Sequence, residues 1–290
     1  MAQTRNVLLI VFPLLGHINP TVQLAKRLAN LGVRVTYMTT VSTINPMSTG
    51  WAIEGISFAG FSDRNVKGNI DEIIYELERC GSQAFREFVA GRIKEGTGFT
   101  HIIYSLLFPW VATVAREFQI PITFLWVQAA SMLNIYYQCY RTDYGDFISK
   151  NIDDPSISVE LPRLTPLKSV DLPSFLPPSN RYQSAIPTIR RDVQMLNEET
   201  KPKVLVNTFD ALEAEALKAI QNYNMVGIDP LIPSAFLDGK NPSDTSFGGD
   251  IFKGTKDYTQ WLNTKPESAV VYVSFGSLAV LAKARKEEIA

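Results

Sequence analysis

Apolar and polar positions along the chain follow two alternating patterns. Short runs that are apolar at nearly every position occupy residues 7–12, 33–38, 56–61, 102–106, 122–127 and 204–206. Longer stretches in which apolar residues recur every three or four positions follow most of them, from residue 20, from residue 70, and over 109–118, 130–140 and 211–220. A run that is apolar on both faces is typical of a parallel strand covered by helices. The alternation therefore predicts a doubly wound α/β fold.

Capping and turn residues set the expected ends of the helices. Asn19 suits the N-cap, Pro20 suits the first helical position and Gly32 follows the last periodic residue, so a helix is predicted from Pro20 onward. The stretch 70–93 has helical spacing, but Gly81 stands in its middle. This stretch is predicted to form either two helices or one kinked helix.

Two stretches rich in turn residues divide the chain. Residues 153–179, with many prolines, are predicted to form a long extended loop of the kind that often wraps a functional site. Residues 228–252, rich in Pro, Gly, Asp and Ser, are predicted to be a linker between domains. We therefore expect an N-terminal domain over 1–227 and the start of a second domain over 253–290.

The part after the predicted linker is short. It is expected to contain a helix near Tyr258–Leu262, a strand Val270–Phe275, the turn Gly276-Ser277 and the beginning of another helix. A single strand with one incomplete helix cannot close a hydrophobic core. The second domain is therefore expected to be cut off.

The composition limits the class of partner. With 46% hydrophobic residues the chain can bury a sizeable core, and its formal net charge of -1 leaves no basic field for nucleic acid. Cys80 and Cys139 cannot make a disulfide framework, and no Cys/His cluster has zinc-ligand spacing, which favours a reducing compartment. No apolar run is long enough to span a bilayer. We expect a cytoplasmic monomer with a small-molecule partner and no membrane insertion.

Candidate chemistry lies where the first apolar run ends, at Gly16-His17. A signal peptide is a rival interpretation of this run because Arg5 precedes it, but no small-residue cleavage site follows. Ligands of doubly wound sheets bind beyond the carboxyl ends of the strands, where His17 is expected, and a neutral imidazole there suits a general base. The alternative is that His17 is a structural residue, hydrogen-bonded in the turn.

Two other kinds of site lack their motifs. No G-x-G-x-x-G follows the first strand, which removes the main support for a dinucleotide-dependent oxidoreductase, although the fold alone allows one. No Asp-x-Asp triplet or carboxylate cluster indicates a metal that would clamp a diphosphate. Any charge stabilisation is therefore expected to come from helix ends and side chains.

Four motifs, taken in this order, resemble a known family. They are Phe12-Pro-Leu-Leu-Gly-His-Ile-Asn-Pro20, Ile103-Tyr-Ser-Leu-Leu-Phe-Pro-Trp110, Leu205-Val-Asn-Thr-Phe-Asp-Ala-Leu-Glu213 and Val270-Val-Tyr-Val-Ser-Phe-Gly-Ser277. The chain resembles the plant family-1 UDP-dependent glycosyltransferases, and most of all the branch with anthocyanin 5-O-glucosyltransferase-like and crocetin glucosyltransferase-like enzymes. The resemblance implies a GT-B fold, here a complete N-terminal Rossmann-like domain and the first βα unit of a second one.

The resemblance also implies an activity. A sugar, usually glucose from UDP-glucose, would be transferred with inversion to a hydroxyl or carboxyl group of a hydrophobic plant metabolite such as a flavonoid, with His17 as general base and no metal or other cofactor. Ser105 stands where many relatives have an aspartate that orients the base. It is either an ordinary strand residue or a weaker orienter suited to an acidic acceptor. His101 matches no family site and is assigned to the surface or a loop.

The remaining site residues are also implied by the resemblance. Acceptor contacts are expected from Leu15, Leu107 and Gln128, and donor contacts from Gly16, Gly276 and Ser277. The aromatic-rich helix Ser131–Tyr140 is expected to pack in the core. The donor-binding signature of the family is missing from the 290 residues. A module that binds a small molecule without catalysis is therefore the alternative function.

Overall fold

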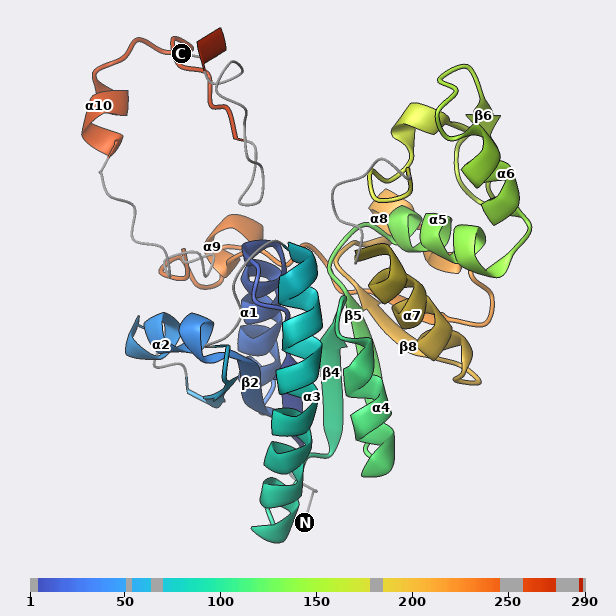
Figure 1. Cartoon of the computed structure of the whole chain (residues 1–290). Coiled ribbons are helices and arrows are strands. Elements are labelled where there is room, and N and C mark those ends of the chain that lie inside the picture. Colours follow the sequence, from blue (N-terminus) through green and yellow to red (C-terminus); the bar gives the residue numbers. More distant parts are fainter. Residues whose placement is uncertain are drawn as a thin grey trace. The chain divides into compact units, whose positions relative to one another are not determined.

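The fold is given by a computed structural model, which describes residues 5–50, 54–63, 70–177, 185–245, 258–274 and 287–288. The chain divides into two compact units, 1–251 and 252–290. In the first unit, seven strands form one sheet in which each neighbouring pair is parallel (Figure 1). In sheet order the strands are β3 (Ile56–Phe61), β2 (Arg34–Thr40), β1 (Asn6–Ile10), β4 (His101–Ser105), β5 (Ile122–Trp126), β8 (Lys203–Val206) and β9 (Asn224–Gly227).

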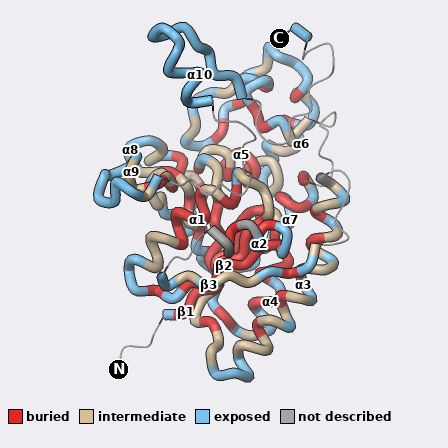
Figure 2. The backbone as a smooth tube through the Cα atoms, turned by 90° about the vertical axis from the view of Figure 1, so that its left-hand side faces the viewer, coloured by how far each residue is buried: buried red, intermediate tan, exposed pale blue. Residues whose placement is uncertain are grey.

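Helices cover both faces of this sheet. One layer contains α1 (Leu15–Asn30) and α2 (Val41–Gly50), and the other contains α3 (Ile70–Lys94), α4 (Pro109–Glu117), α5 (Ala130–Arg141) and α7 (Ala185–Asn197). In β1, Leu8 packs with the second layer and Leu9 with the first, as the alternation along a strand requires. The strands at the centre of the unit are buried and the outer parts of the helices are exposed (Figure 2). The predicted doubly wound α/β fold is confirmed.

The start of α1 differs from the prediction. The helix begins at Leu15, where backbone amides of His17 and Ile18 donate to the Leu14 carbonyl oxygen, and no side chain caps it. Pro20 lies inside the helix and removes the amide that would donate to Gly16. The prediction of a helix that starts at Pro20 with Asn19 as N-cap was therefore wrong. The predicted end is confirmed, because Gly32 follows the helix with a φ of +76°.

Gly81 has a different role from the one its position in the sequence indicated. The stretch predicted as two helices or one kinked helix is a single helix, α3. A Cβ atom on Gly81 would lie 3.0 Å from the Trp110 ring and 3.2 Å from the Phe61 ring. The glycine therefore permits the close approach of α3 to α4 and β3, and it does not break the helix.

The predicted extended loop has its own small core over its described residues, 153–177. It follows α6 (Tyr144–Asn151) and contains the short antiparallel pair β6 (Ser158–Val159) and β7 (Leu167–Lys168), then the 3₁₀ turn η1 (Ser169–Asp171). The buried residues of this core are Ile135, Ile148, Ile152, Val159, Leu161 and Leu172. The segment is therefore folded onto the end of α5.

The last part of the first unit also differs from the pattern. In place of one helix over 211–220 there are α8 (Asp210–Glu213) and the 3₁₀ turn η2 (Ala216–Lys218), and the edge strand β9 was not predicted. Beyond β9, the Arg27 guanidinium of α1 donates to the carbonyl oxygens of Ile228 and Pro230, at 2.9 and 2.7 Å. Lys26 pairs with Asp244 at 2.6 Å, and α9 (Ser234–Leu237) lies between these two contacts in sequence. Residues 228–245 are thus bound to α1.

The second unit confirms one prediction and corrects another. The helix expected near Tyr258–Leu262 is present as α10 (Thr259–Asn263). The strand expected over Val270–Phe275 is not formed in its described part, 270–274, where Val271 and Tyr272 are more than four-fifths exposed. An apolar run needs a neighbouring strand to satisfy its backbone groups, and within the described part of this unit none pairs with it. Gly276 and Ser277 lie outside the described residues.

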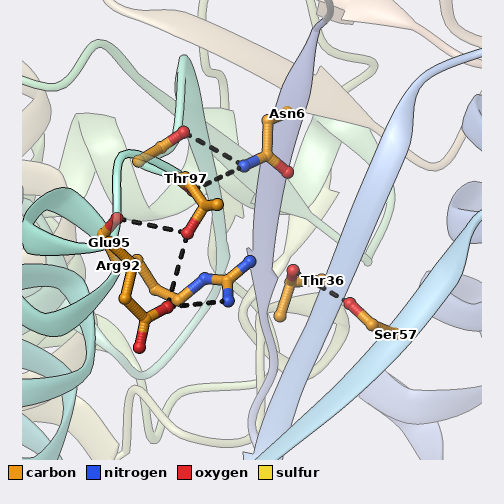
Figure 3. Close-up of polar contacts among 7 residues, drawn as sticks. Asn6, Thr36, Ser57, Arg92, Glu95 and Thr97 are labelled. Carbon is orange, nitrogen blue, oxygen red and sulfur yellow. Dashed lines mark hydrogen bonds and ion pairs between the residues drawn. The ribbon is translucent and has the colours of Figure 1, made fainter.

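Polar side chains close the amino end of the sheet (Figure 3). The side-chain amide of Asn6 donates to the backbone carbonyl oxygens of Thr97 and Gly98, both at 3.0 Å, and so holds the loop after α3 to the start of β1. The Thr97 hydroxyl donates in turn to the Arg92 carbonyl at the end of α3. This network connects the end of α3 to the amino end of β1. The candidate site lies at the other end of the strands, where their carboxyl ends meet.

Candidate active site

The candidate site lies where the winding of the sheet reverses. From β1 the chain runs outward through β2 to β3, and from β4 it runs the other way through β5 and β8 to β9. Because β1 and β4 are neighbours, their carboxyl ends lie side by side, and the loops beyond them diverge toward α1 and α4. Doubly wound folds bind ligands in the crevice at such a switch point.

His17 and Ser105 meet at this point. His17 stands in the first turn of α1, Ser105 ends β4, and the distance from Nδ1 to Oγ is 3.4 Å. Ser105 is fully buried and His17 is 8% exposed. The Phe12 ring lies beside the imidazole with centroids 5.4 Å apart, and the Phe12 amide donates to Ser105 Oγ at 3.0 Å. The structure thus brings together the two residues that the motifs singled out.

Burial keeps the imidazole neutral. Desolvation lowers the pKa of His17 to about 4, so at neutral pH one ring nitrogen carries a proton and the other has a free lone pair. The Ser105 proton has two acceptors in range, Nδ1 of His17 and the Leu106 carbonyl at 3.5 Å. Donation to Leu106 leaves Nδ1–H pointing at Ser105 and Nε2 free to accept a proton, whereas donation to Nδ1 reverses these roles. A serine therefore allows both tautomers, where a carboxylate would select one.

The residues expected to contact the acceptor are half-buried, whereas Gly16, expected to contact the donor, is exposed. Leu15 and Gln128 are half-buried and Gly16 is exposed, with no atom within 4 Å of the place where a Cβ would stand. Leu107 is half-buried and has a φ of +75°. Gly16 thus leaves open space in the first turn of α1, where backbone N–H groups lack helical partners.

Two side-chain amide oxygens beyond the carboxyl ends of the strands are buried without hydrogen bonds in the described structure. Among the residues that the structure describes, none donates to Oε1 of Gln128, which follows β5, or to Oδ1 of Asn19 in α1. Most buried polar atoms in proteins have a partner, so such atoms indicate positions for bound water or ligand atoms. Gln128 therefore has the polar group that a binding role requires.

Asp192 is a buried carboxyl group that sequence reasoning missed. It lies in α7, is 1% exposed, and its Oδ2 accepts the Leu107 amide hydrogen at 3.0 Å. Burial raises its pKa well above the usual range for an aspartate. Helical spacing could have identified it as a core-facing residue, since Asp192 stands three residues after Ile189 and four before Leu196, which are both in the core.

His101 lies at the other end of β4. It is the first residue of that strand and half-buried, and its Nε2 lies 2.7 Å from the Thr123 hydroxyl of β5. Burial, with a smaller contribution from the Lys203 charge, lowers its pKa. Its assignment to the surface or a loop was therefore wrong, because parallel pairing with Val7 of β1 places it in the sheet.

Other features of the first unit do not join the site. A cavity of about 700 Å³ beside α6 has Thr142, Asp143, Tyr144, Phe147, Ser158 and Glu160 among its lining residues. Within the described ranges no group of three or more His, Cys, Asp or Glu side chains is placed to hold a metal ion. None of the helices in these ranges is both long and apolar enough to cross a bilayer.

Comparison with known proteins gives close relatives of one kind. The chain is 48% identical to the chloroplastic crocetin glucosyltransferase of Gardenia jasminoides over 300 aligned residues, which cover 100% of this chain and 63% of that protein. It is 49% identical to the phloretin 4'-O-glucosyltransferase of Malus domestica, over 98% of this chain and 62% of that protein. The chain belongs to the plant UDP-glycosyltransferase family. No family model matches it.

Solved structures of this family share the fold. The structure of Os79 from O. sativa in complex with UDP matches with a TM-score of 0.80 and 25% identity, over 98% of this chain and 64% of that one. A Phytolacca americana structure with UDP-2fluoro-glucose and pterostilbene matches with a TM-score of 0.73 and 20% identity, over 98% and 62%. The GT-B assignment is thereby confirmed. The chain spans about 63% of the length of the first of its curated relatives.

Proposed function

We propose that this chain carries the acceptor-binding and base-supplying half of a glycosyltransferase that transfers glucose from UDP-glucose, with inversion, to a hydroxyl or carboxyl group of a hydrophobic plant metabolite. The observation that supports this most is the buried, neutral His17 beside Ser105 at the switch point of the sheet. The relatives are named for crocetin, phloretin and an anthocyanidin 3-O-glucoside. Crocetin and phloretin are therefore the acceptors to test first.

In this proposal His17 acts through Nε2. This nitrogen takes the proton of the acceptor while the acceptor oxygen attacks the anomeric carbon of the sugar, and UDP leaves from the opposite side. A base whose pKa is about 4 is weak, so it suits a carboxyl group or an acidic phenol better than an aliphatic alcohol. Of the two tautomers that Ser105 allows, the productive one has Nδ1–H donating to Ser105 Oγ while the serine proton points to the Leu106 carbonyl.

The donor side of the proposal is less complete. The open space at Gly16, at the amino end of α1, would admit a diphosphate, which the positive end of the helix dipole favours. We propose no metal, since the chain has no Asp-x-Asp triplet. Gly276 and Ser277 are proposed to contact UDP by their family motif.

The division of the chain is also a proposal. We propose 1–227 as the acceptor-binding domain, 228–252 as the linker and 253–290 as the beginning of the donor-binding domain. The division of contacts after residue 251 supports a break near the end of that linker. The monomeric state and the cytoplasmic location stay predictions, and the name of the crocetin relative specifies the chloroplast.

A transfer assay tests the proposal. The 290-residue chain and a chimera that continues with the remaining part of the Malus domestica relative are each incubated with UDP-glucose and with phloretin or crocetin, and the glucoside is quantified by mass spectrometry. The chimera is expected to form product with both acceptors. With phloretin, the same chimera with His17→Ala is expected to form almost none, whereas crocetin, whose carboxyl groups are ionised at pH 7, needs no base. An active chimera whose transfer to phloretin is indifferent to His17→Ala would refute the role of the histidine.

A binding module without catalysis is the second candidate function. The unpaired buried oxygens of Gln128 and Asn19 favour it, because they provide for a ligand whether or not a donor site is complete. Titration of the 290-residue chain with phloretin, followed by tryptophan fluorescence, is expected to saturate. Saturation without any transfer by the chimera would favour the module over the enzyme.

A further inference from the structure

The turn between β4 and α4 contains an unusual backbone conformation. Leu107 has a φ of +75°, in the left-handed region that residues other than glycine seldom adopt because Cβ approaches the following carbonyl oxygen. The turn contains no glycine to relieve the strain. Some other contact must therefore hold the backbone in this shape.

A side chain from a distant helix makes that contact. Asp192 Oδ2 accepts the Leu107 amide hydrogen at 3.0 Å, across 85 positions of sequence. Asp192 is fixed in place because its neighbours in α7, Ile189 and Val193, are each 1% exposed within the core that α7 shares with α4. The acceptor oxygen is thus presented by a rigid element and not by a loop.

The residues on either side of the contact are held by other elements. The Leu106 amide donates to the Leu125 carbonyl of β5 at 3.3 Å. Ser105 Oγ receives the Phe12 amide hydrogen and lies against His17. Three successive residues are therefore positioned by three different parts of the fold, and release of Leu107 would shift both its own side chain and Ser105.

We propose that Asp192 is a positioning residue that keeps the turn in the conformation presenting Leu107 to the acceptor and Ser105 to His17. This inference rests on the proposed function, because it requires an acceptor for Leu107 to contact. Within the described chain Oδ1 of Asp192 is buried without a partner, which a neutral carboxyl group tolerates better than a carboxylate. Burial raises the pKa of Asp192 in agreement with that state.

Four variants of the 290-residue chain test the proposal: Asp192→Asn, Asp192→Ala, Leu107→Gly and the double variant Asp192→Ala/Leu107→Gly. Phloretin affinity is measured by tryptophan fluorescence, and the free energy of unfolding by urea titration. Asp192→Asn keeps the acceptor oxygen and is expected to bind phloretin within about twofold of the unchanged chain, whereas Asp192→Ala weakens binding by about tenfold. Glycine adopts the left-handed conformation without help, so in the Leu107→Gly background Asp192→Ala should change affinity by less than about twofold.

A control separates positioning from general stability. Asn197 also lies in α7 and donates to the Val193 carbonyl and the Tyr223 hydroxyl, away from the turn. Asn197→Ala is expected to lower the unfolding free energy and leave phloretin affinity unchanged. Equal losses of affinity from Asp192→Ala in the unchanged chain and in the Leu107→Gly background would overturn the proposal, as would a tenfold loss in Asp192→Asn.

Two further outcomes are informative. If the unchanged chain binds neither phloretin nor crocetin, the acceptor-binding role in the proposed function fails, and the urea data alone decide whether Asp192 and Leu107 are coupled. If Asp192→Ala does not fold, the test passes to the double variant, which must fold if the aspartate serves to hold the strained turn. A double variant that also fails to fold would refute that role.

Discussion

The two ends of the parallel sheet are built differently. At the amino end the Asn6 amide finds two carbonyl acceptors, and the Thr97 hydroxyl finds a third in Arg92, so that the polar side chains serve the chain itself (Figure 3). At the carboxyl end, Gln128 Oε1 and Asp192 Oδ1 are buried without partners in the described structure. Arg92 Nε, at the amino end, is also buried without a partner in the described structure, so unpaired atoms alone do not separate the two ends. The ends differ in what their bonded side chains do: at the amino end Asn6 and Thr97 hold the loop after α3 to β1, whereas at the carboxyl end acceptor oxygens stay open near the candidate site.

The two histidines show the same contrast. His101, at the amino end of β4, makes a short contact of 2.7 Å with the Thr123 hydroxyl between adjacent strands. His17, across from the carboxyl end of β4, makes a long contact of 3.4 Å with Ser105. Burial lowers both pKa values, so their charge does not distinguish them. What distinguishes them is the length of the hydrogen bond, which is short at His101 and long at His17.

Replacement of each histidine by alanine is expected to give the largest effect of the tests of this contrast. In the active chimera with phloretin as acceptor, His17→Ala is expected to lower kcat by about a hundredfold to ten-thousandfold, the usual contribution of a general base. His101→Ala should leave kcat within about twofold and lower the free energy of unfolding by about 1 kcal/mol through its lost hydrogen bond. Steady-state kinetics and urea unfolding on both variants provide the comparison. Similar kinetic losses in the two variants would erase the distinction between the ends.

Removal of the Asn6 amide tests the stabilising end. Asn6→Ala leaves the Thr97 and Gly98 carbonyl oxygens without their donor, and is expected to lower the free energy of unfolding by about 2 to 3 kcal/mol. Phloretin affinity, measured well below the unfolding transition, should not change. Asn151→Ala is the matched control, because Asn151 donates to a carbonyl at an exposed position and its loss should cost less than about 0.5 kcal/mol.

The pH dependence of stability tests the carboxyl end. The pKa of His17 is about 4 in the folded chain and near 6.5 when unfolded, so the unfolded state binds more protons between these values. The contribution of neutral His17 to the free energy of unfolding is therefore fully present above about pH 6.5, and it is lost as the pH drops toward 4. The contribution of His17 between pH 7 and pH 5 is about 2 kcal/mol. Asp192, whose pKa burial raises, changes stability in the opposite direction, so the unchanged chain is compared with His17→Gln by urea titration at both pH values. Between pH 7 and pH 5 the unchanged chain should lose about 2 kcal/mol more than the variant. An unchanged pH dependence in the variant would contradict the buried, neutral state of His17.

The apolar runs of the sequence predicted every strand of the sheet except β9, at one of its two edges. Runs such as 102–106 and 122–127 are apolar on both faces because both faces are covered, and this makes them visible without an alignment. The edge strand β9 is short and Val226 within it is 45% exposed, so it lacks that signature. The start of α1 was misplaced because Asn19-Pro20 has the local form of a helix start, whereas the actual start depends on the loop that leaves β1.

The same reasoning separates the predictable part of the site from the rest. His17 and Ser105 were found because each belongs to a short motif at the end of a strand. Asp192 was not, because the partner that gives it a role is 85 residues away and belongs to another element. Local patterns show which side chains face the core, and a carboxyl group on such a face is the sign that a distant partner exists.

The smallest expected effect, and the one that bears most directly on acceptor choice, comes from Ser105→Asp. A carboxylate in place of the Ser105 hydroxyl would accept Nδ1–H, select the tautomer with a free Nε2 and raise the pKa of His17, so its base strength would increase. In the chimera we expect a gain of about tenfold in kcat/KM for the phenolic acceptor phloretin, with the acidic limb of the pH profile moved to higher pH. Crocetin, whose carboxyl groups are ionised at pH 7, should show almost no gain. Ser105→Asn is the control, because it has nearly the same shape without the charge. If the two substitutions act alike, Ser105 does not limit the base strength of His17. A preference of the enzyme for acidic acceptors must then come from the acceptor pocket.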